Sequence, residues 1–364
     1  LYTTAETYLQ RAYGAALAAQ DHSGLAGVLL YLGEMTWKRG AYERAEQYLQ
    51  TGLGYAREID DHERICALLA NLGSISWKRG EYKQAETDLR EGLTLARQLG
   101  DLESIGRLLD ILGSVEKMQG NYSQAEAYLQ EGLNLARQIE AKEIICTIIL
   151  SLGIIAGEQG KYTQAEIDFQ EGLLIARQLQ HSEWISGFLN SLGDIASEQG
   201  HYKQAICYFK EGLELARQLE HREWTSFLLL NLGITTRKQR NYALSEAYLQ
   251  ESLVLAQQIG IPQITCYIVN EYGNLHLGQY LSDAAEKDFQ EILATVPVGG
   301  QDFIAFAQYG LARVAAARGD QEEAQALGEK SLLVLEEMGH REAQEVKSWL
   351  CTLQDSRIAS AKRD

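Results

Sequence analysis

Residues 72–97 read LGSISWKRGEYKQAETDLREGLTLAR, and residues 112–137 repeat this stretch as LGSVEKMQGNYSQAEAYLQEGLNLAR. Both begin with Leu-Gly, carry a Gly-x-Tyr segment near the middle, and continue with alanine and leucine at matching places. The offset is forty residues, and the first glycine keeps that spacing through most of the chain, at Gly33, Gly73, Gly113, Gly153, Gly193, Gly233 and Gly273. A fixed period of this length is typical of a solenoid, in which each unit buries one face on the next.

Each unit contains two stretches in which apolar residues follow helical spacing, one before and one after the Gly-x-Tyr segment. This segment should end the first helix and begin the second, so each unit is expected to be a hairpin of two ~17-residue helices. Gly33 and its counterparts fall in the middle of the first helix, where glycine is a poor helix former. We therefore expect these glycines, with Ala45 and Gly52 of the second helix, to let the two backbones approach closely.

The composition suits a helical protein and opposes several functions. The 364 residues include two prolines, which favours long uninterrupted helices. The formal charge of −17 opposes binding to nucleic acid or to an anionic membrane, because both need a basic face. The five cysteines form no C-x-x-C pair and no apolar run could span a bilayer, which favours a cytoplasmic protein with free thiols. Cys66, Cys146 and Cys266 share one column with Ala26 and are expected to be small packing residues.

The repeat resembles the tetratricopeptide repeat, whose signature is Trp-x2-Leu-Gly-x2-Tyr followed by Ala-x3-Phe and Pro. Leu72-Gly73, Ala85 and Leu89 stand at the Leu-Gly, Ala and Phe places. The Trp place is aliphatic, the second Tyr place is small, and Arg57 and its counterparts stand at the Pro place. The period exceeds the usual ~34 residues. The forty-residue repeat is similar to those in the arrays of animal polarity adaptors and in the sensor regions of bacterial signal-transducing NTPases of the STAND and NB-ARC type.

The resemblance implies an all-α fold, an α-solenoid of helical hairpins wound into a right-handed superhelix. We expect residues 1–20 to be the second helix of a truncated repeat, residues 21–340 to form eight hairpins, and residues 341–364 to form a capping helix and a polar tail. Because residues 1–20 align with second helices, we interpret the chain as a fragment of a longer protein. The unbroken period predicts one continuous array without an internal domain break.

Comparison of the units within the chain predicts the working surface. Constant positions of the first helix must satisfy packing in every unit, whereas the variable positions 24, 27, 30, 34, 37 and 38 share one helical face. In tetratricopeptide arrays this face lines the concave groove, so the resemblance implies a partner-binding site there. The eighth unit should add Phe303, Phe306 and Tyr309 to this face. The candidate binding residues are Arg107, Asp110, Ile154, Trp184, Asn190, Asp194, Trp224, Phe227, Tyr267, Asn270 and Asn274.

These residue types predict a protein or peptide ligand. Exposed aromatic and aliphatic side chains on a concave face mark binding sites, and interleaved amides suit a peptide backbone. The alternative is that a tight superhelix buries these residues against one another or against the loops. Asp194 favours a ligand with Lys, Arg or a free amine, whereas a competing site at Trp37 and Trp77, with Lys38 and Lys78, would suit an acidic peptide.

The sequence offers little for catalysis, for a cofactor or for a metal ion. His181 and His221 share one column of the repeat, so repetition explains them better than metal ligation. Gly160-Lys161 resembles the end of a phosphate loop, but Tyr162 stands where Ser or Thr is required. We therefore expect no enzyme, no cofactor and no metal site.

Two functions from different classes remain open. The first is a binding module that takes a protein or peptide ligand in the concave groove. The alternative is the ligand-sensing regulatory region of a larger bacterial signal-transducing NTPase or transcriptional regulator, excised from its catalytic domain. In that case other domains of its own full-length chain would also be partners. Neither function involves nucleic acid or a membrane.

Overall fold

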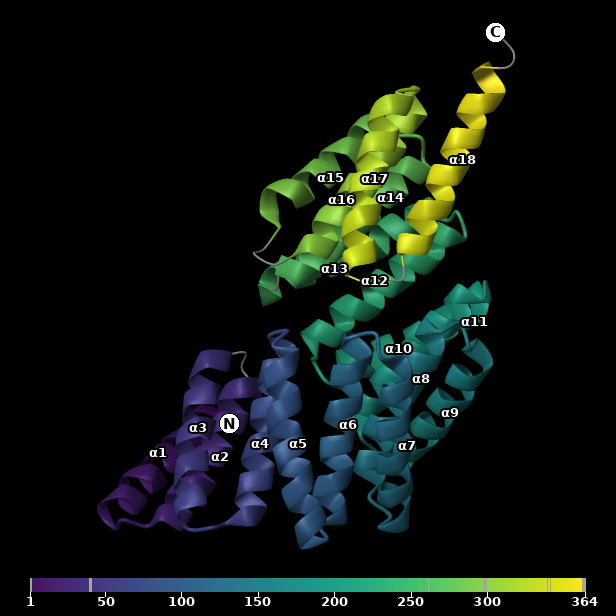
Figure 1. The fold of residues 1–364 in the computed structure, drawn as a ribbon. Coiled ribbons are helices and arrows are strands. Elements are labelled where there is room, and N and C mark those ends of the chain that lie inside the picture. Colours follow the sequence, from purple (N-terminus) through teal and green to yellow (C-terminus); the bar gives the residue numbers. More distant parts are fainter. Residues whose placement is uncertain are drawn as a thin grey trace. The chain divides into compact units, whose positions relative to one another are not determined.

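The computed structural model describes residues 2–38, 41–260, 262–296, 300–338, 340 and 342–361. The elements in these ranges are eighteen α-helices, which confirms the all-α class (Figure 1). The chain divides into two compact units, Leu1–Gln159 and Gly160–Asp364. Each unit has its own row of hairpins, and the continuity of one right-handed superhelix across Gln159 and Gly160 stays a prediction.

Both units are stacks of helical hairpins. The first unit contains α1 (Tyr2–Ala18), α2 (His22–Lys38), α3 (Tyr42–Glu58), α4 (His62–Lys78), α5 (Tyr82–Leu99), α6 (Leu102–Met118), α7 (Tyr122–Gln138) and α8 (Lys142–Glu158). The second unit contains α9 (Tyr162–Gln178), α10 (Ser182–Glu198), α11 (Tyr202–Gln218), α12 (Arg222–Lys238), α13 (Tyr242–Ile259), α14 (Pro262–Gly278), α15 (Ser282–Thr295), α16 (Gln301–Arg318), α17 (Gln321–Glu337) and α18 (Ala343–Ala361). The even-numbered helices from α2 to α16 are the first helices of hairpins, and the odd-numbered helices from α3 to α17 are the second helices.

The turn inside each hairpin follows the predicted Gly-x-Tyr segment, and every second helix from α3 to α13 begins at the tyrosine. The turn glycines have φ between +75° and +78°, at Gly80, Gly120, Gly160 and Gly200, a left-handed conformation that glycine adopts without steric cost. Gly40 lies outside the described residues. Arg240 and Tyr280, which replace the glycine in later repeats, keep the same turn at φ of +61° and +62°.

The mid-helix glycines lie where the two helices of a hairpin approach most closely. A β-carbon on Gly33 would lie 2.5 Å from Cγ of Leu49, and one on Gly113 would lie 2.6 Å from Cγ of Leu129. Both leucines are fully buried. The predicted close approach of the helices is confirmed, and it explains why a poor helix former recurs at this position.

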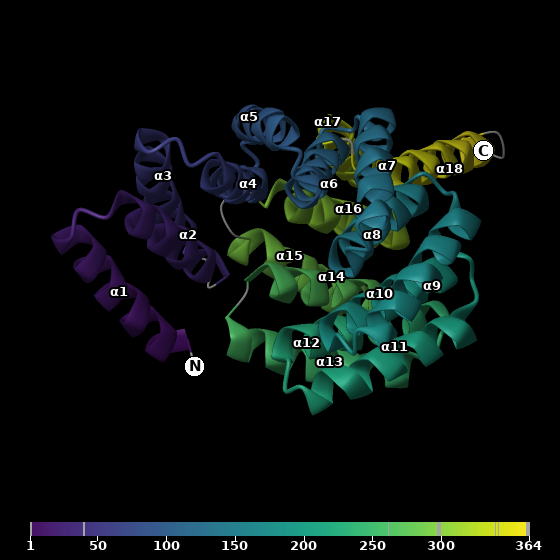
Figure 2. The ribbon, with the colours of Figure 1, turned by 90° about the horizontal axis from the view of Figure 1, so that it is seen from below.

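The first helices form the more closely packed row of each unit. In the first unit α2, α4, α6 and α8 contact one another in turn, and in the second unit α10, α12, α14 and α16 do the same. The second helices α3, α5 and α7 of the first unit, and α11, α13 and α15 of the second, each pack between their own first helix and the first helix of the next hairpin. The first helices therefore form the inner side of each unit, and Figure 2 shows α10 and α12 on the inner side of α11 and α13.

The arginines at the Pro place of the repeat form a regular series of ion pairs on the outer side. Four of them pair with a glutamate thirty-four residues later, on the next second helix: Arg57–Glu91 (2.5 Å), Arg97–Glu131 (2.6 Å), Arg177–Glu211 and Arg217–Glu251 (2.5 Å). The side chains are about half exposed, so each pair contributes little to stability. Their regularity shows that the same joint recurs between hairpins.

The last hairpins pack around one aromatic ring. Phe289 of α15 is fully buried, and a β-carbon on Gly273 of α14 would lie 2.5 Å from its Cε1. Gly310 of α16 faces the same ring from the other side of the joint. Helix α18 packs on α17, with Val346 and Leu350 buried in this core.

Candidate functional site

The candidate residues of the first unit lie on its inner first helices. Arg107 is exposed on α6 and pairs with Glu103 at 2.8 Å, one turn earlier on the same helix. Asp110 is half-buried and accepts a hydrogen bond from the Ser151 hydroxyl of α8 at 3.0 Å. Ile154, half-buried on α8, is the third candidate in this unit. Whether these residues share a surface with the candidates of the second unit stays a prediction.

Burial gives Asp110 an unusual protonation equilibrium. Removal of the carboxyl from water raises its pKa to about 6, against the lowering effect of hydrogen bonds from Ser151 and Thr147. The charged form therefore costs more free energy than in an ordinary carboxyl, although it still predominates above pH 6. Asp110 acts in the first place as part of an inter-repeat contact between α6 and α8.

In the second unit three polar side chains join α10 to α12. The Asn231 amide donates to Oδ1 of Asn190 at 2.8 Å and to Oδ1 of Asp194 at 3.1 Å. The Asn190 amide donates in turn to Oδ2 of Asp194 at 3.1 Å. Asn190 is half-buried and Asp194 is exposed, whereas Oδ1 of Asn231 accepts no hydrogen bond from the described residues. The cluster thus keeps acceptor capacity at Oδ1 of Asn231.

A second polar chain joins α12, α14 and α16. Both side-chain oxygens of Glu271 are engaged, Oε2 by Arg237 at 2.9 Å and Oε1 by the Asn274 amide at 2.9 Å. Oδ1 of Asn274 accepts from the Arg313 guanidinium. Asn270, one turn before Asn274, is half-buried, and its side chain makes no hydrogen bond among the described residues.

The aromatic candidates are partly packed against neighbours. Trp184 is half-buried and stacks on His181, with ring centroids 4.3 Å apart. Trp224 is half-buried and lies over Gly187 of the preceding first helix. Phe227 packs against the hydrophobic core of α12 to α14. Tyr267 keeps 39% of its surface exposed.

The expected exposure of two eighth-unit aromatics is wrong. Phe303 and Phe306 are buried, at 4% and 6% exposed. The physical reason is ring packing between α14 and α16, because Tyr267 meets Phe303 edge to face at a centroid distance of 4.7 Å. Tyr309 is half-buried and contacts Trp349 of α18 at a centroid distance of 5.5 Å.

Sequence reasoning missed four residues of these networks, namely Asn231, Arg237, Glu271 and Arg313. Asn231 and Glu271 occupy a column next to the candidate columns, and their long polar side chains, where the three preceding repeats have Ile111, Ser151 and Ser191, were the available signal. Arg313 was hidden because the eighth unit is shifted by one residue, with Ala312 at the place of the mid-helix glycine. The candidates predicted from sequence lie on the same helices as these networks but make up only part of each network.

The competing site in the first unit is built differently. The Lys78 ammonium lies 4.3 Å from the Trp77 ring centroid, a cation–π contact, and burial lowers the pKa of Lys78. Lys117 of α6 pairs with Glu158 of α8 at 3.3 Å. Trp37 packs on the neighbouring core, and the Lys38 side chain lies outside the described residues.

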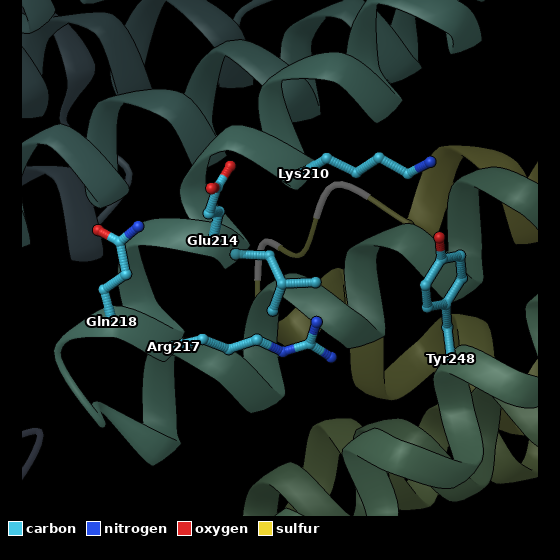
Figure 3. Close-up of a pocket in the computed structure, with 6 residues that line it drawn as sticks. Lys210, Glu214, Arg217, Gln218 and Tyr248 are labelled. Carbon is cyan, nitrogen blue, oxygen red and sulfur yellow. The ribbon is translucent and has the colours of Figure 1, made fainter.

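An open cavity of about 670 Å³ lies on the outer side, between α11 and α13. Figure 3 shows Lys210 and Arg217 extending toward the side where Tyr248 lies, with Gln218 at the opposite end. The lining residues are Lys210, Leu213, Glu214, Arg217, Gln218 and Tyr248. Arg217 already pairs with Glu251, and charges of both signs line the cavity, so it offers no defined site for one class of ligand.

The recurring histidines have a structural role at helix starts. Nδ1 of His181 accepts from the Trp184 backbone N–H at 3.4 Å, and Nδ1 of His221 accepts from that of Trp224 at 3.3 Å. These contacts cap α10 and α12. In the ranges that the structure describes, no group of three or more His, Cys, Asp or Glu side chains is placed to hold a metal ion. No helix in those ranges is long and apolar enough to cross a membrane.

Comparison with known families agrees with this architecture. The family model of the tetratricopeptide repeat matches residues 63–138 and 144–218. These two segments belong to the tetratricopeptide-repeat family. No curated relative matches the sequence at a significant level.

Solved structures of repeat proteins share the fold at low sequence identity. A tetratricopeptide repeat protein from Parabacteroides merdae has a TM-score of 0.57 at 18% identity, covering 80% of this chain and 99% of its own. A STAND protein with a tetratricopeptide repeat sensor from Pyrococcus horikoshii has a TM-score of 0.60 at 15% identity, covering 94% of this chain and 54% of its own. The Rap conjugation gene regulator of the plasmid pLS20, in complex with the Phr* peptide, has a TM-score of 0.59 at 12% identity and covers 78% and 79%.

Proposed function

We propose that the chain is a peptide-binding module whose ligand lies along the inner face of α10, α12 and α14. The observation that carries the proposal is a row of asparagine side chains on these three consecutive first helices, at Asn190, Asn231, Asn270 and Asn274. A side-chain amide can donate to a peptide carbonyl and accept from a peptide N–H. Oδ1 of Asn231 and the whole amide of Asn270 retain this capacity.

Apolar contacts next to the amides complete the proposed site. Tyr267 is 39% exposed, one turn before Asn270, and Phe227 occupies the matching position on α12. Amides bind the backbone of an extended peptide, while aromatic surfaces receive its side chains. The peptide complex of the pLS20 regulator, a repeat protein of similar fold, supports this class of ligand.

The charge of the site favours a cationic group near α10. Asp194 is exposed beside Asn190 and Asn231, in a chain of net charge −17. We propose that a Lys, Arg or free amine of the ligand lies near Asp194. A cytoplasmic, bacterial setting and the absence of an enzymatic reaction belong to the same proposal.

The test is selection of peptides from a random library on the immobilised chain, followed by affinity measurement on variants. Asn270→Ala and Tyr267→Ala should each weaken binding about tenfold or more, while Tyr248→Ala on the outer side should leave it unchanged. Asp194→Asn should reduce the salt dependence of binding. Loss of affinity only in Trp37→Ala and Trp77→Ala would move the site to the first unit and overturn the proposal.

A second candidate is the sensor region of a larger signal-transducing NTPase. The Pyrococcus horikoshii structure favours it, because this chain spans about half of that STAND protein. The peptide site would then serve as the input of a switch. The full-length reading frame tests this candidate, since an NTPase module on the same chain is required.

A further inference from the structure

Arg313 of α16 occupies an unusual place on the inner side of the second unit. Its Nη2 donates to Oδ1 of Asn274, and its guanidinium carbon lies 4.8 Å from the centroid of the Tyr309 ring. Its Nε is enclosed by protein and has no hydrogen-bond partner. The residue as a whole is half-buried.

No carboxylate among the described residues forms an ion pair with this guanidinium, although Glu345 and Glu271 lie near enough to favour its charged form. Among the described residues the other inner arginine of this unit, Arg237, pairs with Glu271 at 2.9 Å. Both oxygens of Glu271 are occupied, by Arg237 and Asn274, and Arg313 reaches only the neutral amide. A largely desolvated cation without a direct ion-pair partner, and an enclosed N–H without an acceptor, both cost free energy.

The missing partner is defined by the chemistry of the guanidinium. Its planar N–H groups match a carboxylate through two parallel hydrogen bonds, a geometry that a lysine cannot provide. Asn270 and Asn274 lie one turn apart on α14, so the free amide and the cation without an ion-pair partner belong to the same stretch of the inner face.

We propose that Arg313 receives a carboxylate of the peptide ligand, from an acidic side chain or from the C-terminus. This inference rests on the proposed function and sets the direction in which the ligand lies along the inner face. Its cationic group lies toward Asp194 on α10 and its carboxylate toward Arg313 on α16.

Glu345 of α18 modulates this site. Its carboxylate accepts from the Tyr309 hydroxyl at 3.3 Å, on the ring that lies beside the guanidinium. Because its negative charge lies near the position of the incoming carboxylate, it should oppose binding. Glu345→Gln should therefore raise the affinity for a carboxylate, and Arg313→Lys should lower it.

The direct test is NMR spectroscopy of the arginine side-chain Nε–Hε groups of the full chain, titrated with glutarate as the probe. The cross-peak that disappears in Arg313→Lys should shift to a saturable end point in the wild type. The cross-peak assigned through Arg217→Lys, an outer arginine paired with Glu251, is the matched control and should stay in place. An Arg313 cross-peak that stays in place, or one that moves linearly with all the others, overturns the inference.

The library-selected peptides separate this inference from the proposed function. Arg313→Lys should weaken their binding at least tenfold, as should replacement of their carboxylate. Amidation of the C-terminus and Asp→Asn or Glu→Gln changes in the peptide distinguish the two carboxylate sources. Peptides that require Asn270 but neither Arg313 nor a carboxylate overturn the inference and leave the proposed function intact. A saturable glutarate shift at Arg313, with no peptide selected from the library, leaves the inferred carboxylate site intact and contradicts the proposed function.

Discussion

The Cγ atom of Leu89 lies 2.5 Å from the point where a β-carbon on Gly73 would stand. No side chain fits in that space, because non-bonded carbon atoms in contact lie about 3.5–4.0 Å apart. The short distance between α4 and α5 therefore requires glycine at this position, and the leucine fills the remaining volume. The same pairing recurs along the array, as Gly33–Leu49 and Gly233–Leu249.

Gly73→Leu should force α4 away from α5 and destabilise the protein by about 3 kcal/mol, since overpacking of a dense core is costly. Denaturant unfolding followed by circular dichroism measures this loss. Gly54→Ala is the matched control, because Gly54 is a helical glycine of α3 with no atom within 4 Å of a β-carbon. It should stabilise the chain by ~0.5–1 kcal/mol through helix propensity alone. A similar gain from both substitutions would contradict this account.

Tyr280→Gly should stabilise the second unit by about 0.5 kcal/mol. Tyr280 holds a left-handed φ of +62° and is 93% exposed, so glycine relieves the backbone cost without the loss of a side-chain contact. Gly120→Ala at φ +77° is the reverse change in the first unit and should destabilise by ~1 kcal/mol. Thermal unfolding of the two variants checks both signs.

Asp110→Asn should stabilise the protein at neutral pH and have little effect in acid. The pKa of Asp110 is raised to about 6 in the folded state from an ordinary value of 3.8. Between these values the folded state binds more protons than the unfolded state, so stability falls as pH rises through this window. The charged carboxyl then costs on the order of 1–3 kcal/mol at pH 7.5, which asparagine avoids. Urea unfolding at pH 4.5 and 7.5 tests the prediction, and an equal effect at both values would refute it.

Three of the five thiols should react slowly with a polar thiol reagent. Cys66, Cys146 and Cys266 are buried, and burial raises the pKa of Cys66 and Cys146 to about 11, so little thiolate forms at pH 8. Cys207 and Cys351 are exposed and should react at once. Release of chromophore from an aromatic disulfide counts the fast thiols, and the unfolded chain in urea gives the total. Rapid reaction of all five thiols in the native protein would contradict this prediction.

The sequence was sufficient to predict the hairpins because their signals are local and repeated. Tyr82 and Tyr122 begin helices because the preceding glycine ends the earlier one, and the mid-helix glycine specifies the partner surface. Repetition also grouped His181 with His221, and the structure shows both at the same capping place.

The site could be predicted only in part because its contacts depend on the offset between neighbouring repeats. Asn231 reaches back to Asn190 and Asp194, a contact between residues about forty apart, and the rotamers decide it. The burial of Phe303 depends on Tyr267 of the preceding first helix. Such inter-repeat pairs carry no periodic signal, so residue types indicate the face but not which groups are already engaged.

The outer ion pairs have a consequence for the history of the chain. The repeat that carries Arg97 also supplies Glu91 to Arg57 of its predecessor, and the repeat that carries Arg217 supplies Glu211 to Arg177, so donor and acceptor sit at opposite joints of the same repeat. Duplication of one forty-residue segment therefore regenerates a complete joint on both sides, and deletion of one closes the gap with the same partners. The gene can gain or lose whole repeats without a compensating substitution at the junction, and the length of the binding face can evolve separately from its chemistry.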